Sequence, residues 1–287
     1  VNDSKNDQFW VQTQNPKLAI QRGSSMGEAS KHAVLTGGAS GIGAEILRKL
    51  QAQGARVTVL DRADCPAADR ALRVDMSDLG AIDAAVALID EPVDMLFNIA
   101  GIPPRAENGA LVLAVNLFGL RHLTEALMPK LVDAAPIVNM ASMAGAAWPQ
   151  NIDEVKTVLA MPNDSDPAAA LTTLGIDATR AYNLSKEAVI VWTIQQTALG
   201  LPRGIRMNSV CPAAVSTGIL DDFKSAFGPQ VTAAIARAGR ASAPDEVADL
   251  ALFLASDASR WIKGGEYKID GGIGASRVAA TMGLIET

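Results

Sequence analysis

Two side chains that could exchange a proton lie one helical turn apart near the middle of the chain. Tyr182 and Lys186 are four residues apart in a segment whose apolar residues predict a helix over 183–199, so both face the same side of it. A phenol with a pKa of about 10 is a weak base at neutral pH, but a neighbouring ammonium favours its ionised form. Ser142 ends a strand-like run over 137–142 and could bind a substrate oxygen beside the phenol. Alone, a Tyr-x-x-x-Lys pair is usually a coincidence on an amphipathic helix.

A glycine-rich turn follows the first strand-like run, residues 32–36. Residues 36–43 read Thr-Gly-Gly-Ala-Ser-Gly-Ile-Gly, and residues 44–53 have the apolar spacing of a helix. A strand, a glycine turn and a helix bring backbone N–H groups and the positive helix end against a pyrophosphate. Glycine is needed where a Cβ would block that approach or where φ is positive. An ordinary β–α turn is the alternative. The predicted dinucleotide contacts are Gly37, Ser40, Gly41, Ile42 and Gly43.

An acidic residue ends the second strand-like run, residues 56–60. Asp61 follows the glycine turn by about 20 residues, where a carboxylate can bind adenosine ribose hydroxyls and repel a 2′-phosphate. Arg62 could partly offset that repulsion, and Ser40 adds no positive charge. This favours NAD over NADP, with a plain strand-end carboxylate as the alternative. Oxidised nicotinamide and Lys186 would then lower the pKa of Tyr182 towards 7, a stabilisation of about 4 kcal/mol.

In this order and spacing, the motifs resemble those of the short-chain dehydrogenase/reductase family from about Lys31 to the end of the chain. The resemblance implies a catalytic set of Asn116, Ser142, Tyr182 and Lys186, in which Asn116 holds a water linked to the lysine and Lys186 also holds the cofactor ribose. Ile99 and Ala213 depart from the family motifs. The further cofactor contacts that the resemblance implies are Asp75, Met76, Asn98, Ala100, Gly101, Pro212, Val215 and Thr217.

The size and the order of elements predict one α/β domain. At 287 residues and 29.9 kDa, the chain suits a single large domain. Strand-like and helical segments alternate, which predicts a doubly wound parallel sheet of the Rossmann type with helices on both faces. The strand-like runs 95–99 and 137–140 are apolar throughout, as expected for strands buried on both sides. Residues 1–25 are polar, and we expect an extraneous leader before a domain over 26–287; a native arm that packs through Phe9 and Trp10 is the alternative.

Three spacings depart from the family pattern, and one of them is the short segment from Gly101 to Asn116. The segment from Asp61 to Asp75 looks too short for a helical crossover, so a loop is expected there. The segment from Ser142 to Tyr182 is long, and we expect a helical insert over 146–178 before the catalytic helix. Its predicted helices cover 152–159 and 167–174, since Pro167 suits a first helical position. The insert is expected to wall the substrate pocket; a surface decoration is the alternative.

The substrate is indicated less directly. Ile219, Leu220, Phe223 and Phe227 follow Thr217, and Met143, Trp148 and Met161 could add apolar surface, although residues at this spacing are more often core. They favour a bulky apolar or aromatic alcohol over a sugar. Within the family, the stretches 98–103, 137–149, 186–192 and 259–264 resemble coniferyl-alcohol dehydrogenases and 3α-hydroxysteroid dehydrogenase/carbonyl reductases. A nucleotide-sensing regulator without chemistry is a remote alternative, against which the intact catalytic set argues.

Composition argues against several other classes. The net charge of −6, without a basic cluster, argues against a nucleic-acid partner. Cys65 and Cys211 are the only cysteines, which suits a reducing cytoplasm. His32 and His122 are isolated, so no metal site is expected, and no apolar run is expected to span a membrane. The resemblance implies a homodimer or homotetramer. The insert is expected to obstruct a four-helix contact and to favour a dimer through 266–269 and 245–254.

Overall fold

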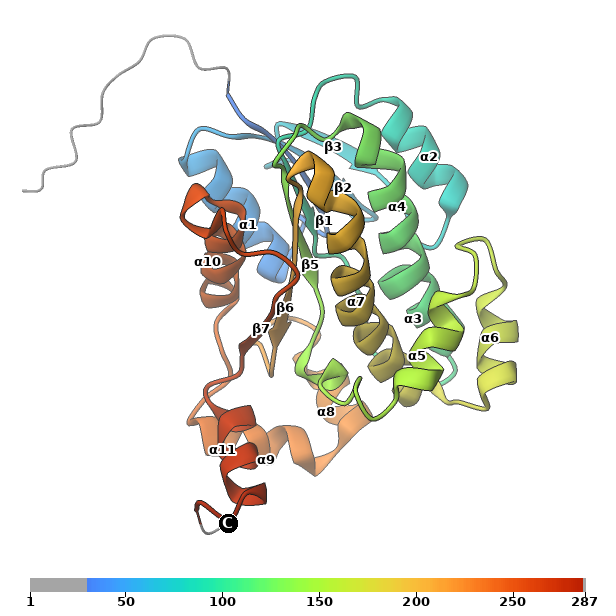
Figure 1. Cartoon of the computed structure of the whole chain (residues 1–287), viewed down its shortest axis with the longest axis vertical. Helices are drawn as coiled ribbons and strands as arrows, with labels where there is room; N and C mark the ends of the chain where they lie inside the picture. Colours follow the sequence, from blue (N-terminus) through green and yellow to red (C-terminus); the bar gives the residue numbers. More distant parts are fainter. Residues whose placement is uncertain (1–29, 286–287) are drawn as a thin grey trace, which may run out of the picture.

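The computed structural model describes residues 30–285 of the chain. The expected leader, residues 1–25, lies outside the described residues. Seven parallel strands form one sheet in the order β3-β2-β1-β4-β5-β6-β7, with helices on both faces (Figure 1). The strand order reverses between β1 and β4, so the predicted single-domain, doubly wound α/β fold is confirmed.

The strands are short, and helices connect their carboxyl ends to the next strand except between β2 and β3. The strands are β1 (His32–Thr36), β2 (Arg56–Asp61), β3 (Arg70–Arg73), β4 (Met95–Asn98), β5 (Pro136–Met140), β6 (Arg206–Pro212) and β7 (Glu266–Ile269). The α-helices are α1 (Gly41–Ala52), α2 (Leu79–Ala87), α3 (Gly109–Leu113), α4 (Leu120–Leu127), α5 (Ile152–Leu159), α6 (Pro167–Leu174), α7 (Ala178–Gly200), α8 (Leu220–Phe227), α9 (Pro229–Ala238), α10 (Pro244–Ala255) and α11 (Ile273–Thr281). Shorter helical turns are η1 (Ala114–Gly119, a π-helix), η2 (Met128–Lys130), η3 (Met143–Gly145), η4 (Leu201–Arg203) and η5 (Asp257–Ser259).

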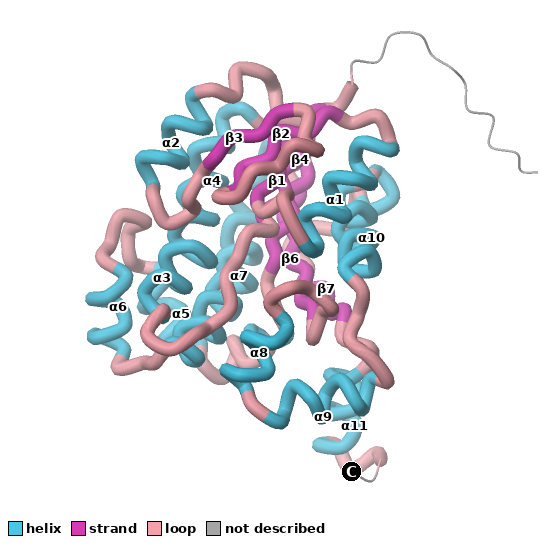
Figure 2. Tube along the Cα trace, turned by 180° about the vertical axis from the view of Figure 1, so that it is seen from behind, coloured by secondary structure: helices cyan, strands magenta, loops and turns pink. Residues whose placement is uncertain are grey.

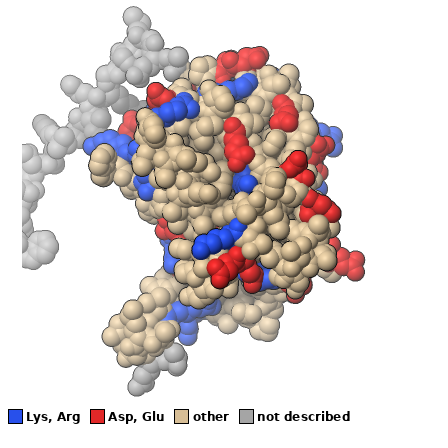
Figure 3. Space-filling model, turned by 45° about the vertical axis from the view of Figure 1, so that its right-hand side comes forward, with Lys and Arg blue, Asp and Glu red and all other residues tan. Residues whose placement is uncertain are grey.

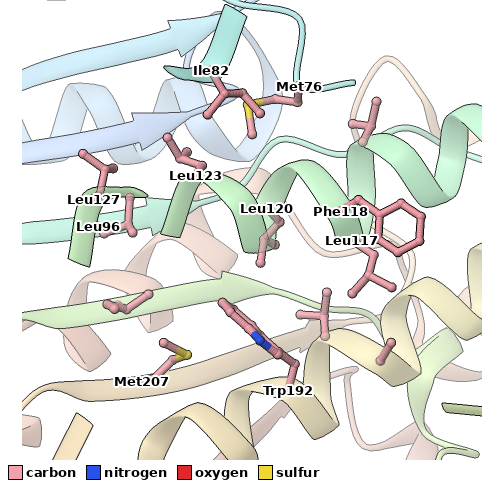
Figure 4. Close-up of a cluster of buried hydrophobic side chains, with 14 of the residues drawn as sticks. Met76, Ile82, Leu96, Leu117, Phe118, Leu120, Leu123, Leu127, Trp192 and Met207 are labelled. Carbon is pink, nitrogen blue, oxygen red and sulfur yellow. The ribbon is translucent and has the colours of Figure 1, made fainter. Parts of the chain in front are cut away.

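Each face of the sheet has its own apolar core. Successive residues of β1 alternate between the two cores, since Val34 packs in one while Ala33 and Leu35 pack in the other. The first core lies under α2, α4 and α7, where Phe118 and Trp192 are almost fully buried (Figure 4). The second lies under α1 and α10, on the opposite side of the strands (Figure 2). Burial on both faces explains why these strands are apolar throughout.

The helix that carries the tyrosine and lysine begins earlier than the apolar pattern predicted. α7 starts at Ala178, because the Asp177 side chain accepts a hydrogen bond of 2.7 Å from the backbone N–H of Arg180 and caps the helix. Tyr182 therefore lies in the second turn of α7 and not before its start, as the predicted range 183–199 implied. The predicted loop between Asp61 and Asp75 is confirmed, because residues 62–69, between β2 and β3, contain no helix.

The insert forms the two predicted helices and packs on the outside of α7. α5 packs against α7 and α6 packs against α3, at the side of the molecule away from α1 and α10 (Figure 1). Val155, Val158 and Ala170 of the insert are buried in the first core.

A buried carboxylate ties the insert to α7. Glu187 is fully buried and accepts hydrogen bonds of 2.7 Å from Asn151 and from Arg180. Arg180 also binds Glu154 of α5, at 2.8 Å. Because a buried charge is costly unless it is paired and hydrogen-bonded, these contacts fix the insert against α7. We call Glu187, Arg180, Asn151 and Glu154 the Glu187 cluster.

One helical stretch is long and apolar enough to span a membrane, although no such stretch is expected from the sequence. By length and composition alone, Gly109–Lys130 could cross a membrane. However, 67% of its most apolar part is buried inside the domain, as in the core helix of a globular protein. The surface carries acidic and basic side chains interspersed over the face that Figure 3 shows, without a continuous basic area there.

Candidate active site

A cavity of about 440 Å³ opens at the carboxyl ends of the central strands. Gly101 follows β4, Ser142 follows β5, Pro212 ends β6, and all three line the cavity together with Tyr182 and Lys186 of α7. Ligands of open parallel sheets bind at this edge, next to the point where the strand order reverses. The structure thus brings together three of the four predicted catalytic residues in one cavity.

The Tyr182 side chain is almost completely buried and packs against two aromatic rings. Tyr182 is 5% exposed, and the rings of Phe223 and Phe227 meet it edge-on with centroids 5.2 and 6.0 Å away. Burial raises the pKa of Tyr182 to about 12, although a hydrogen bond with the Ser142 side chain acts in the opposite direction. In the chain by itself, desolvation therefore outweighs any stabilisation of the phenolate by Lys186. The expectation that oxidised nicotinamide and Lys186 together lower this pKa towards 7 stays a prediction.

The lysine reaches the same cavity from one turn further along α7. Its Nζ lies 5.8 Å from the centroid of the Tyr182 ring and donates a hydrogen bond of 2.8 Å to the carbonyl of Met140 at the end of β5. Burial lowers the pKa of Lys186 to about 8. The amine can therefore change its charge near neutral pH, beside the phenol whose ionised form it would stabilise.

Asn116 lies behind the cavity wall and does not line it. It is fully buried in η1, and both atoms of its side-chain amide bind the backbone of Ile102, at 2.8 and 3.1 Å. A Cβ on Gly101 would lie 3.2 Å from Oδ1 of Asn116 and 3.4 Å from Nζ of Lys186. Asn116 therefore fixes the loop that passes the lysine, and π-helical turns are frequent at functional sites. Its role in a water relay stays a prediction.

The glycine turn can take no larger residue at two positions. A Cβ on Gly43 would lie 2.0 Å from the carbonyl oxygen of Gly37, and a Cβ on Gly37, whose φ is +74°, would lie 2.9 Å from Ala100. Thr36 Oγ1 accepts hydrogen bonds from the N–H groups of Ile99 and Ala100, at 2.9 and 3.0 Å, and holds the loop after β4 against the turn. The turn therefore has the close-packed form that leaves its backbone open to a pyrophosphate.

Asp61 lies beside this turn, as its position in the sequence predicted. Its carboxylate accepts hydrogen bonds from the N–H of Ala39 at 3.0 Å and from that of Ala63 at 2.9 Å. Arg62 is exposed. The turn reaches the cavity, because a Cβ on Gly41 would lie 3.3 Å from Thr217. A dinucleotide that extends from Asp61 to the cavity therefore fits these residues.

Most of the other predicted cofactor residues lie along the cavity or in the glycine turn. Ile42, Gly101, Pro212, Val215 and Thr217 line the cavity, while Gly37, Ser40, Gly41 and Gly43 form the turn, Ala100 packs on it, and Asp75 follows β3. Hydrogen bonds from the N–H and hydroxyl of Ser77 lower the pKa of Asp75.

Two predicted cofactor residues have side chains that point into the core. The Asn98 side chain donates to Thr124 and Asn139 at 2.9 and 2.8 Å, and Met76 packs in the first core (Figure 4). Neither side chain lines the cavity. A motif match identified these positions but not the direction of their side chains.

The apolar residues predicted to surround the substrate are confirmed in part. Met143, Ile219, Phe223 and Phe227 line the cavity, whereas Leu220, Trp148 and Met161 do not. The Trp148 indole N–H binds Glu266 at 3.1 Å instead. No residue of the insert lines the cavity, so the expectation that the insert walls the pocket is wrong.

Among the lining residues that sequence reasoning missed, four come from α9 and α11. Their chemistry gives no signal in the sequence, because only the folded chain brings these late segments to the cavity. The described residues contain no cluster of three or more histidine, cysteine or acidic side chains suited to a metal. The four residues from α9 and α11 are Gln230, Val231, Ala234 and Arg277.

Burial of Lys186 predicts a pH-dependent effect on stability. Its pKa falls from 10.5 in the unfolded chain to about 8 in the folded one, so between these values the unfolded state binds more protons and stability rises with pH. Lys186→Met removes the buried ammonium. Its free energy of unfolding relative to the native sequence should fall by about 2 kcal/mol between pH 7.5 and 10.

Urea unfolding at a series of pH values measures this difference. Lys156→Met, which changes an exposed lysine of α5, is the control and should show a difference that does not change with pH. If the difference in free energy of unfolding between Lys186→Met and the native sequence also does not change with pH, the folded protein does not disfavour the ammonium of Lys186.

The similarities to known proteins extend over most of the chain. Residues 31–152 match the family described as short chain dehydrogenase, and residues 168–274 match the family described as Enoyl-(Acyl carrier protein) reductase. Coniferyl-alcohol dehydrogenase of Pseudomonas sp. (strain HR199 / DSM 7063) is 36% identical over 253 residues, which are 87% of this chain and 98% of that protein. The 3-alpha-hydroxysteroid dehydrogenase/carbonyl reductase of Comamonas testosteroni is 28% identical over 250 residues, 84% of this chain and 96% of that protein.

A solved structure shares the fold as well. The crystal structure of the 3-alpha-hydroxysteroid dehydrogenase from Pseudomonas sp. B-0831, complexed with NADH, superposes with a TM-score of 0.75 at 32% identity and covers 87% of this chain and 99% of that one. Such likeness over whole domains, and not over single motifs, means that this chain belongs to the short-chain dehydrogenase/reductase family of oxidoreductases.

Proposed function

We propose that the chain is an NAD-dependent dehydrogenase that reversibly interconverts a bulky apolar alcohol, of the aryl type that coniferyl alcohol represents, and its carbonyl compound. The observation that carries this proposal is the cavity itself, in which Ser142, Tyr182 and Lys186 meet an apolar wall that includes Phe223 and Phe227. The 36% identity to a coniferyl-alcohol dehydrogenase supports the same substrate class. The four intact catalytic positions argue against a regulator without chemistry.

Each residue has a role in alcohol oxidation that follows from its position. Ser142 orients the substrate hydroxyl, and Tyr182 accepts its proton as general base. Lys186 stabilises the phenolate, and Asn116 supports a water relay to the lysine. Bound NAD would supply the hydride acceptor and, in its oxidised form, a positive charge that favours the phenolate. In carbonyl reduction, Tyr182 returns the proton as general acid.

A second candidate is a 3α-hydroxysteroid dehydrogenase/carbonyl reductase. Its support is the likeness to the NADH complex of such an enzyme and to the enzyme of Comamonas testosteroni. An apolar cavity of about 440 Å³ suits a flat ring system as well as an aryl alcohol. NADH absorbance measured with a panel of aryl alcohols and hydroxysteroids separates the two candidates.

We also propose that the protein acts as a homodimer or homotetramer in the cytoplasm. Trp261, which follows η5, is 93% exposed, and Phe253 of α10 is 43% exposed, so apolar surface lies near the predicted dimer contact. Cys65 and Cys211 are free thiols, as is usual in a reducing compartment. A mass measurement in solution tests the assembly, and a monomer would contradict it.

Replacement of the proposed base should abolish most activity. Tyr182→Phe preserves the ring that packs against Phe223 but removes the proton acceptor. Turnover of the alcohol should fall by about two to four orders of magnitude, while the Kd for NAD, measured by fluorescence, stays within a few fold. Turnover close to that of the native enzyme would contradict the role of Tyr182.

Asp61 should set the preference for NAD. Asp61→Asn keeps a hydrogen-bond acceptor beside the glycine turn and removes the charge that repels a 2′-phosphate. The ratio of kcat/KM for NADP to that for NAD should rise by about 10- to 100-fold. Asp64→Asn, at an exposed position of the same loop, is the matched control. A native enzyme that prefers NADP would show that Arg62 prevails over Asp61.

A further inference from the structure

The last helix of the described chain, α11, brings a cation to the mouth of the cavity. A turn fixes where this helix starts: Gly271 and Gly272 have φ angles of +64° and +84°, and Asp270 accepts hydrogen bonds from Gly272 N–H at 2.9 Å and from Gly274 N–H at 2.7 Å. α11 packs against α9, below the ends of β6 and β7 (Figure 2). Its direction is therefore set by the fold.

One face of α11 meets the residues that follow the catalytic serine. A Cβ on Gly274 would lie 3.3 Å from Cε of Met143, next to Ser142 in the sequence. Arg277 lies three residues later, on the same face of the helix, and lines the cavity with Met143 and with Gln230 of α9. Arg277 is exposed although it lines the cavity, which places it at the open side.

The charges around the cavity are all positive. Arg277 and Lys186 are the only charged residues among those that line it, and no carboxylate is among them. Lys186 is 4% exposed and already donates to the Met140 carbonyl. α9 and α11 contain no Asp or Glu, and no ion pair within residues 30–285 includes Arg277. A negative group that enters the cavity would thus meet an arginine that forms no ion pair within residues 30–285.

We propose that Arg277 binds a carboxylate at the end of the substrate distant from the reacting hydroxyl. This inference rests on the proposed function and narrows its substrate class to apolar alcohols that carry an acid group. The planar guanidinium can hold a carboxylate through two parallel hydrogen bonds, while the apolar wall binds the body of the molecule. Because Arg277 is exposed, the contribution is modest, about fivefold in affinity.

Matched substrate pairs test this assignment. 4-(Hydroxymethyl)cinnamic acid and its methyl ester present the same alcohol with and without the charge, and a 3α-hydroxy bile acid and its methyl ester do so for the steroid candidate. In the native enzyme, kcat/KM for the acid should exceed that for the ester by about fivefold. Arg277→Gln should remove this ratio through a higher KM for the acid, while the ester and the kcat values stay unchanged.

Two further variants make the test specific. Arg277→Lys keeps the charge but not the planar fork, so it should restore part of the ratio. Arg237→Gln removes a charge from α9 at a position that does not line the cavity, and should leave the ratio intact. Half-molar salt should reduce the ratio in the native enzyme.

Other outcomes would overturn the assignment. Equal kcat/KM for acid and ester in the native enzyme would reject it, while the proposed function would stand because the ester is still oxidised. If Arg277→Gln instead raises the KM for NAD and slows both substrates alike, Arg277 contacts the cofactor and not the substrate. Absence of turnover with every acid and ester would reject the proposed function, and the inference with it.

Discussion

The site depends on α7, a helix with two oppositely charged residues buried next to each other in the sequence. Lys186 and Glu187 are neighbours on α7, and both are almost completely buried. Adjacent residues of a helix do not face each other, so each charge needs its own partners. Lys186 binds the carbonyl of Met140 at the end of the sheet, and Glu187 binds Arg180 and Asn151 on the insert side. Because an unpaired buried charge is costly, this arrangement fixes α7 between the sheet and the insert.

The insert therefore supports the site from behind and does not form the substrate pocket. α5 packs against α7, and the Glu187 cluster ties the two together. The other end of the same segment is fixed to the sheet, since Trp148 binds Glu266 of β7. The segment that follows Ser142 and Met143 is thus fixed both to the sheet and to α7. Residues of α8, α9 and α11 form the pocket wall instead.

Local signals account for what the sequence predicted well. The glycine turn, the strands and both insert helices follow from glycine spacing, apolar runs and Pro167 at a helix start, which depend on neighbouring residues alone. The early start of α7 was missed although Asp177 gives a local capping signal. The side-chain directions of Asn98 and Met76, the contact of Trp148 with Glu266 and the approach of Arg277 depend on distant segments, and no local pattern encodes them.

Desolvation sets the resting protonation of the proposed proton-transfer pair. Burial raises the pKa of Tyr182 to about 12 and lowers that of Lys186 to about 8, so the chain alone keeps the phenol protonated. A phenolate at neutral pH needs further positive charge beside the ring, which in the proposed function comes with oxidised NAD. In the proposed function, the base would therefore become available when oxidised NAD is bound, because the same buried surroundings that oppose the phenolate also strengthen its attraction to that charge.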